Sequence, residues 1–254
     1  MVLGAQIFGQ TAGSEIRKIS IGSLQSHFTD FGSERAWNGQ YYGGLRWPAE
    51  YPGQDNAVIK RAWIGCQDFT DETSTNHDNY TVYFYSGDVG RTLYPTELSQ
   101  TAKFCNPSVI VNGLEYNYLA GDVIDTVDPT QIADRRIMNV VNTSMGLTQT
   151  REILAFSNQN HDNYFIKIFT YTNTGNTNGD PEIELNDSLH GVRIGWGSRY
   201  SCGREGAYLH DWSYAYGKHS WVTRRGEDYP DHYLDPITPE NPIANWLRSG
   251  FSWM

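Results

Sequence analysis

The chain has 254 residues, of which 19% are charged and 14% aromatic, and its formal net charge is −10. Adjacent basic residues occur only at 17–18, 60–61, 135–136 and 224–225, so the chain lacks the cationic stripe that binds phosphates or anionic lipids. This composition disfavours nucleic-acid and membrane-surface partners, and no apolar run reaches the ~18 residues of a membrane span. Abundant aromatic, Gly and Asn residues favour an all-β protein with many loops.

Short β-forming segments separated by turn signals follow one another along the chain, without helical periodicity. Strands are expected at 15–23, 57–65, 80–86, 107–112, 137–141, 151–156, 164–172 and 189–195. In the segment 164–172, one face carries Phe165, Lys167, Phe169 and Tyr171. Long aromatic-rich loops are expected, one of them at 31–52, and residues 68–79 are expected to form an acidic loop. The pattern predicts an antiparallel β-sandwich, Ig-like in kind.

The pentapeptide Asn-His-Asp-Asn-Tyr occurs at 76–80 and again at 160–164, each time just before an aromatic strand. This repetition predicts two related β-sandwich modules, 14–145 and 146–254. Its Asn and Asp residues favour a turn, because their side chains bond to nearby backbone amides. The alternative is a calcium site whose carboxylate ligands come from Asp68, Asp71, Asp78 and Asp162.

Both ends of the sequence predict a piece of a longer exported protein. Residues 1–13 resemble the end of a signal peptide, with an ordinary N-terminal strand as the alternative. Aromatic residues continue to position 253, which is typical of a second module truncated at its C-terminal end. Secretion, or a place on the outer cell surface, is therefore expected. In that setting Cys66 and Cys105 are the expected disulfide pair, with three unpaired thiols as the alternative.

One stretch carries a family resemblance. Residues 160–177 end in YTNTGNT, which resembles the strand and turn of Ig-like repeats in bacterial surface proteins. Together with 47–49 and 61–65, the stretch resembles large secreted proteins of Bacteroidetes-like bacteria that commonly carry a type IX secretion sorting domain. The resemblance covers about residues 15–200 and implies export and a β-sandwich, but no activity.

No familiar catalytic motif is present: GxSxG, HExxH, the P-loop and GxGxxG are all absent from the sequence. The densest aromatic stretch is a candidate surface for glycans or proteins, or else a second core, and contains Trp196, Tyr200, Tyr208, Trp212, Tyr214, Tyr216 and Trp221.

The sequence therefore predicts a non-catalytic structural or adhesive protein outside the cell, such as a subunit of a surface layer or filament. Such a subunit would associate with itself or with other surface proteins. No catalytic residue is assigned, and the only cofactor considered is calcium. A carbohydrate-binding module, stabilised by calcium, is the alternative. A polysaccharide-acting hydrolase with its site in 196–235 is a further one.

Overall fold

The computed structural model describes residues 15–35, 45–48, 57–116 and 122–200. Apart from one 3-10 turn at Ser86–Asp88, all regular elements in these ranges are strands, and most pair antiparallel. The all-β, antiparallel fold class predicted from the sequence is therefore confirmed. Within the same ranges, no helix is long and apolar enough to span a membrane.

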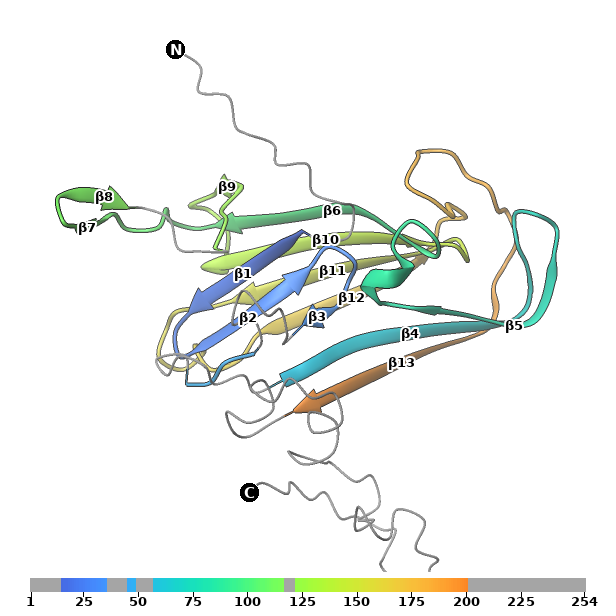
Figure 1. Ribbon diagram of the computed structural model, residues 1–254, viewed down its shortest axis with the longest axis horizontal. Helices are drawn as coiled ribbons and strands as arrows, with labels where there is room; N and C mark the ends of the chain where they lie inside the picture. Colours follow the sequence, from blue (N-terminus) through green and yellow to red (C-terminus); the bar gives the residue numbers. More distant parts are fainter. Residues whose placement is uncertain (1–14, 36–44, 49–56, 117–121, 201–254) are drawn as a thin grey trace, which may run out of the picture.

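Six strands form the larger sheet, which we call the β4 sheet (Figure 1). They are β1 (Ile16–Ile21), β2 (Leu24–Thr29), β3 (Glu34–Arg35), β4 (Ala57–Thr70), β5 (Asn76–Tyr83) and β13 (His190–Tyr200). Strand β13 lies along one side of β4, while β3 and then β5 pair with its other side. Strand β4 therefore has neighbours on both sides along most of its length.

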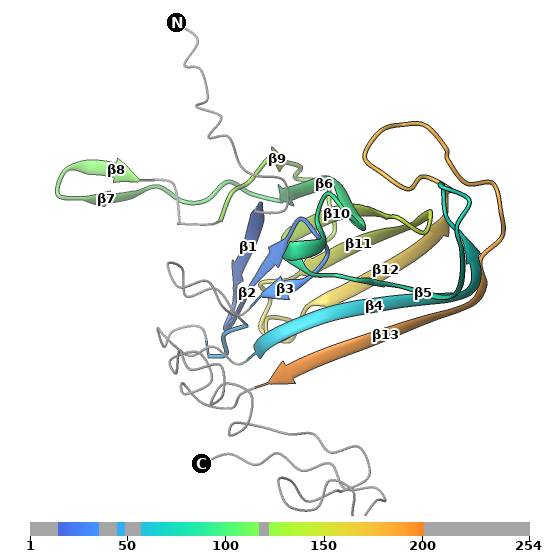
Figure 2. The same cartoon turned by 45° about the vertical axis from the view of Figure 1, so that its right-hand side comes forward.

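Five strands form the second sheet, the β10 sheet, in the order β12-β11-β10-β6-β9. They are β6 (Leu93–Ala102), β9 (Thr126–Val127), β10 (Arg135–Thr143), β11 (Leu147–Ala155) and β12 (Ile166–Asn173). Strand β9 runs parallel to β6, and the other pairs are antiparallel. A separate hairpin of β7 (Val109–Val111) and β8 (Leu114–Tyr116) projects away from both sheets in Figures 1 and 2.

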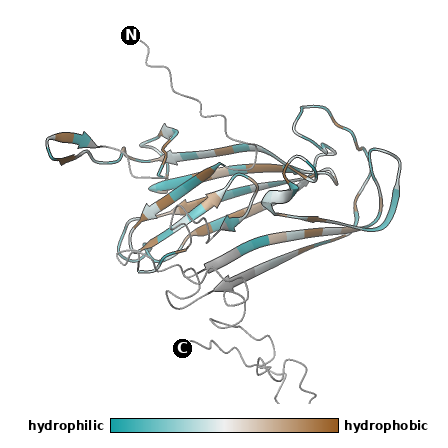
Figure 3. Cartoon of the chain, in the orientation of Figure 1, coloured by the Kyte–Doolittle hydropathy of each residue, from teal (hydrophilic) through white to brown (hydrophobic). Residues whose placement is uncertain are grey.

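The two sheets pack face to face through two clusters of buried apolar side chains, which is the arrangement of a sandwich. One cluster joins Ala62, Ile64, Cys66, Phe69 and Val82 to Leu93, Val141 and Leu147. The other joins Ile19 and Phe28 to Leu98, Ile137 and Ile153. Figure 3 shows apolar and polar residues alternating along the strands, because successive side chains of a strand point to opposite faces.

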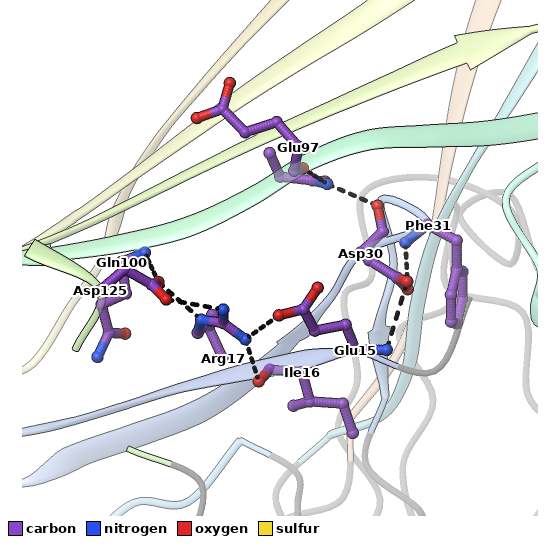
Figure 4. A network of polar contacts seen from close by, with 9 residues as sticks. Glu15, Ile16, Arg17, Asp30, Phe31, Glu97, Gln100 and Asp125 are labelled. Atoms are coloured by element: carbon purple, nitrogen blue, oxygen red, sulfur yellow. Dashed lines mark hydrogen bonds and ion pairs between the residues drawn. The ribbon is translucent and has the colours of Figure 1, made fainter. Parts of the chain in front are cut away.

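Polar side chains join the sheets beside β1 (Figure 4). Arg17 Nε donates to Asp125 Oδ2 at 2.9 Å, and Nη2 donates to Oδ1 at 3.0 Å. The same Oδ2 accepts the backbone N–H of Gln100 on β6 at 2.6 Å. Nearby, Asn139 Nδ2 donates to the carbonyl oxygen of Asp30 at 2.6 Å. These bonds, charge-assisted at Arg17, tie β1 and the turn after β2 to the β10 sheet.

The turn between β2 and β3 needs a glycine. Gly32 has a φ of +82°, a conformation that residues with a side chain rarely adopt. A Cβ at Gly32 would also lie 2.5 Å from Phe84 Cδ1 and 2.6 Å from Gln149 Nε2. Two guanidinium nitrogens of buried Arg151 bond to backbone carbonyls of this turn, at Thr29 (2.8 Å) and Ser33 (3.3 Å). The turn is therefore held against the β10 sheet from both of its ends.

The two copies of the pentapeptide adopt different structures. The second copy forms the turn between β11 and β12, as expected, whereas the first copy is extended and opens strand β5. The turn predicted at 76–80 is therefore wrong, because the reversal occurs earlier, at 71–75, where Asp71 N bonds to the carbonyl oxygen of Thr75. The two copies also lie at opposite ends of the sheets in Figures 1 and 2.

The expected module boundary, between residues 145 and 146, falls in the turn that joins β10 to β11. These two strands pair along their length. Strand β13, from the second expected module, pairs with β4 from the first. Each of the two sheets therefore contains strands from both halves of the chain.

Candidate functional site

Strand β4 presents two different rows of side chains. Ala62, Ile64 and Cys66 point inward and are buried in the core. Because side chains alternate along a strand, the residues between them point outward, away from the β10 sheet. That outward row consists of Arg61, Trp63, Gly65 and Gln67.

The neighbouring strands extend this outward row into a surface, because residues directly opposite one another in antiparallel strands share a face. On β5, Tyr83 lies opposite Trp63. On β13, Gly195 lies opposite Trp63. We call this surface the outer β4 face, and it consists of Arg61, Trp63, Gly65, Gln67, Asn79, Thr81, Tyr83, Arg193, Gly195 and Gly197, with Tyr85 at its margin.

Three aromatic rings stack across the outer β4 face. The rings of Trp63 and Tyr83 are 5.0 Å apart with an interplanar angle of 22°, and those of Tyr83 and Tyr85 are 5.8 Å apart at 23°. Trp63 remains 39% exposed and Tyr85 41%. Because each ring is fixed by a neighbour, a ligand would lose little side-chain entropy when it binds them.

Arg61 holds the two tyrosines in this arrangement. Its guanidinium carbon lies 5.1 Å from the centroid of the Tyr83 ring and 4.8 Å from that of Tyr85. Its Nη1 also donates a hydrogen bond to the hydroxyl of Tyr83. Both distances are within the range of cation–π attraction. Arg61 is therefore positioned within the surface and does not extend freely into solvent.

Glycines on β13 make room for the tryptophan. A Cβ built on Gly197 would lie 2.3 Å from Trp63 Cζ3 and 2.5 Å from its Cη2, so the indole occupies the place of a side chain. A Cβ on Gly195 would have no atom within 4 Å. The backbone of β13 is therefore covered by the Trp63 ring at one glycine and open at the next.

The charge of the outer β4 face differs in sign from that of the chain. Of the described residues that form this face, two are cationic, Arg61 and Arg193, and none is a carboxylate, whereas the net charge of the chain is −10. Arg193 is exposed and lies opposite Gly65, on the same face as Trp63. The surface thus combines aromatic rings, amide and hydroxyl groups, and positive charge.

A buried ionic cluster lies on the inner face of the same sheet. Lys167 Nζ on β12 bonds to both oxygens of the Glu34 carboxylate at 2.6 Å. Glu34 lies opposite Lys60 of β4, so both point inward. Burial alone would raise the pKa of Glu34, but the attraction of Lys167, Lys60 and Arg151 outweighs it and lowers the pKa.

The same cluster has more cations than carboxylates. Burial lowers the pKa of Lys167 to about 8, and repulsion from Lys60 adds to the effect. Burial likewise lowers the pKa of Arg151 to about 10. Both cations also lie near the ring of Phe28, at 5.4 Å for Lys167 Nζ and 5.7 Å for Arg151 Cζ. The Glu34 carboxylate therefore offsets the charge of several buried cations, and its bond to Lys167 connects β3 to β12.

The aromatic stretch predicted as a binding surface lies mostly outside the described residues. Trp196 is described: it points inward from β13, its ring 4.3 Å from that of Phe169 on β12, and is 42% exposed. Tyr200 ends β13. The other members, Tyr208, Trp212, Tyr214, Tyr216 and Trp221, fall outside the described residues, as does most of the region 196–235.

The four aspartates considered for calcium do not come together. Asp162 lies against Gly22 in the turn between β11 and β12, at the opposite end of the sheets from Asp71. Asp71 Oδ2 lies 2.9 Å from His77 Nε2, and this bond, with those from Thr73 and Thr75, holds the pKa of Asp71 well below its usual range. In the described ranges no group of three or more His, Cys, Asp or Glu is arranged to hold a metal ion.

The expected Cys66–Cys105 disulfide is not formed in this structure. Cys66 is buried and Cys105 is exposed, and both are free thiols. Cys66 packs near Leu93, at the start of β6, whereas Cys105 follows the end of that strand at Ala102. At ~3.3 Å per residue the strand spans about 30 Å, and a disulfide requires Cα atoms within about 7 Å.

Sequence reasoning missed the outer β4 face, although both of its aromatic strands were expected. The alternation in 57–65 places Trp63 opposite in direction to Ala62 and Ile64, and 80–86 supplies Tyr83 and Tyr85. The pairing of β13 with β4, which brings in the glycines and Arg193, joins segments far apart in the sequence. Comparisons of the chain with protein-family models, with curated proteins and with solved structures found no match.

Proposed function

We propose that the chain is a non-catalytic carbohydrate-binding and adhesive protein that acts outside the cell, and that its outer β4 face binds the glycan. The observation that carries this proposal is the stack of Trp63, Tyr83 and Tyr85 on an exposed sheet face. Exposed aromatic rings pack against the apolar faces of sugars, and polar groups around them bond to the hydroxyls. Gln67 and Asn79, exposed on the same face, offer such groups.

An extended ligand suits the shape of this surface better than a small one. The outward residues run along three adjacent strands, and Gly65 and Gly195 leave the sheet without bulky side chains between Trp63 and Arg193. A flat strip of this kind contacts several units of a chain and encloses none of them. Polysaccharides are therefore the expected class of ligand.

Replacing Trp63 tests the proposal. With a panel of soluble and insoluble polysaccharides, the unmodified protein should bind at least one polymer, and Trp63→Ala should weaken that binding at least about tenfold. Phe104→Ala is the matched control, because Phe104 is also an exposed aromatic residue, 65% exposed, but follows β6 away from the face. Thermal unfolding of each variant would verify that the fold persists. Absence of binding to every polymer, or equal loss in both variants, would contradict the proposal.

A second candidate function, self-association into a layer or filament, is favoured by the edge formed by β12 and β13. Among the described strands, both lie at the ends of their sheets. Ile194 on β13 and Ile168 on β12 are 39% and 46% exposed, respectively. Unpaired edges with apolar side chains can pair with another copy of a chain. Light scattering and negative-stain microscopy at high concentration should then show assemblies that Ile168→Lys abolishes, and a strict monomer would rule this function out.

A further inference from the structure

We propose that the glycan bound by the outer β4 face is acidic, carrying carboxylate or sulfate groups along an extended polymer. This inference rests on the proposed function, and it specifies the class of ligand. It follows from two arginines on a face whose described residues include no carboxylate, in a chain whose net charge is −10. A neutral ligand would not require a positively charged face on a negatively charged protein.

The contacts of Arg61 prepare it to bind an anionic group. One of its nitrogens donates to the hydroxyl of Tyr83, and its guanidinium is held against two aromatic rings. A guanidinium has five N–H donors in a planar fork, so several remain for a ligand, and the fork matches a carboxylate or sulfate. Because Arg61 is already ordered, little entropy is lost when the anionic group binds.

Arg193 places a second charge at a distance that suits a polymer. Arg61 lies opposite Gly197 and Arg193 lies opposite Gly65, so the two arginines are four residues apart along the direction of the strands. At about 3.3 Å per residue, their backbones are about 13 Å apart in that direction. Trp63 lies between them on the same face. The guanidinium of Arg61 is held against tyrosines of β5 and beyond, on the side of β4 away from β13, so successive acidic units of a polysaccharide can engage one arginine each.

Nucleic acid is a poorer fit to the same charges. Its affinity depends on neutralising many phosphates at once, and this face supplies two arginines within a strongly acidic chain. The aromatic rings therefore have to supply a large share of the binding free energy. The arginines determine whether acidic or neutral polymers are preferred.

The test compares an acidic polymer with its uncharged counterpart and adds a sulfated polymer as a second acidic ligand. Affinity electrophoresis would use polygalacturonate, the same polymer after its carboxyl groups have been reduced to alcohols, and a sulfated galactan, at about 0.05 M and about 1 M NaCl. We expect binding to the carboxylated or the sulfated polymer to exceed binding to the reduced polymer at least about tenfold. This preference should shrink at high salt, where charges are screened beyond about 3 Å. The carboxylated and sulfated arms identify the source of the negative charge.

Charge-reversal variants locate the effect. Arg193→Glu should weaken binding to the acidic polymer roughly fivefold to tenfold and should affect binding to the reduced polymer much less. Arg91→Glu is the control for net charge, because Arg91 is also exposed but lies before β6, outside the face. Equal affinity for the acidic and reduced polymers, or equal effects of the two reversals, would overturn this inference while glycan binding through Trp63 stood. If the unmodified protein bound none of the three polymers, that result would instead refute the proposed function.

Discussion

The two faces of strand β4 differ in how their polar groups are satisfied. On the inner face, Lys60 lies opposite Glu34 in a cluster that is closed by Lys167 from the other sheet. On the outer face, Arg61 donates one hydrogen bond to Tyr83, which leaves other guanidinium donors for a ligand. The inner charges stabilise the sandwich, and the outer charge remains available for a ligand. A mutation of the inner row should therefore change stability, and one of the outer row should change binding.

The largest effect is expected from the inner carboxylate. Glu34→Gln leaves Lys60, Lys167 and Arg151 without the carboxylate that they share, so the free energy of unfolding should fall by about 3–5 kcal/mol. Lys167→Met should cost less, because two cations still pair with Glu34. Urea unfolding of both variants measures the difference. Equal losses would show that the carboxylate is not shared.

A smaller effect is expected from pH. The pKa of Glu34 is lower in the folded chain than its ordinary value of 4.5, so its ionised form stabilises the fold above that pH. This stabilisation is lost as the pH falls through the lowered pKa. The difference in unfolding free energy between the unmodified chain and Glu34→Gln should therefore narrow as the pH falls through the acid range. A difference that widens in acid would contradict this sign.

The smallest effect is expected at the two glycines of β13 beside Trp63, and it should appear in glycan affinity rather than in stability. Gly197→Ala puts a Cβ where the Trp63 ring lies, so the ring must move, and glycan affinity should fall about threefold to tenfold. Gly195→Ala adds the same atom where nothing lies within 4 Å, and it should bind like the unmodified chain. Titration of both variants with the same polysaccharide measures these affinities. Equal affinities would show that glycan binding does not depend on the position of the Trp63 ring.

Sequence patterns located the strands that are rich in aromatic and β-branched residues. In β12, Lys167, Phe169 and Tyr171 were expected on one face, and they pair opposite the inward residues of β11, which confirms that face. Strands β2 and β6 were missed. Strand β6 contains Pro95 and the fully buried Gln100, so its sequence resembles a loop.

The outer β4 face could not be derived from local patterns, because it depends on register between distant strands. Trp63 and Gly195 are opposite one another only when β13 returns to β4 after the entire β10 sheet has been laid down. Periodicity gives the face to which a residue points, but it does not identify the strand beside it. The inner cluster could not be derived from local patterns either, because Glu34 and Lys167 come from distant segments that contact each other across the two sheets.

The position of β13 also has a consequence for the order of folding. Its partner β4 is synthesised early, but the side of β4 that receives β13 stays unpaired until residues 190–200 have been made. Closing so long a loop is slow compared with forming hairpins such as β10–β11. The core between β4 and β10 can therefore form before the glycines and Arg193 arrive. A nascent chain should acquire its stability first and its affinity for glycan last.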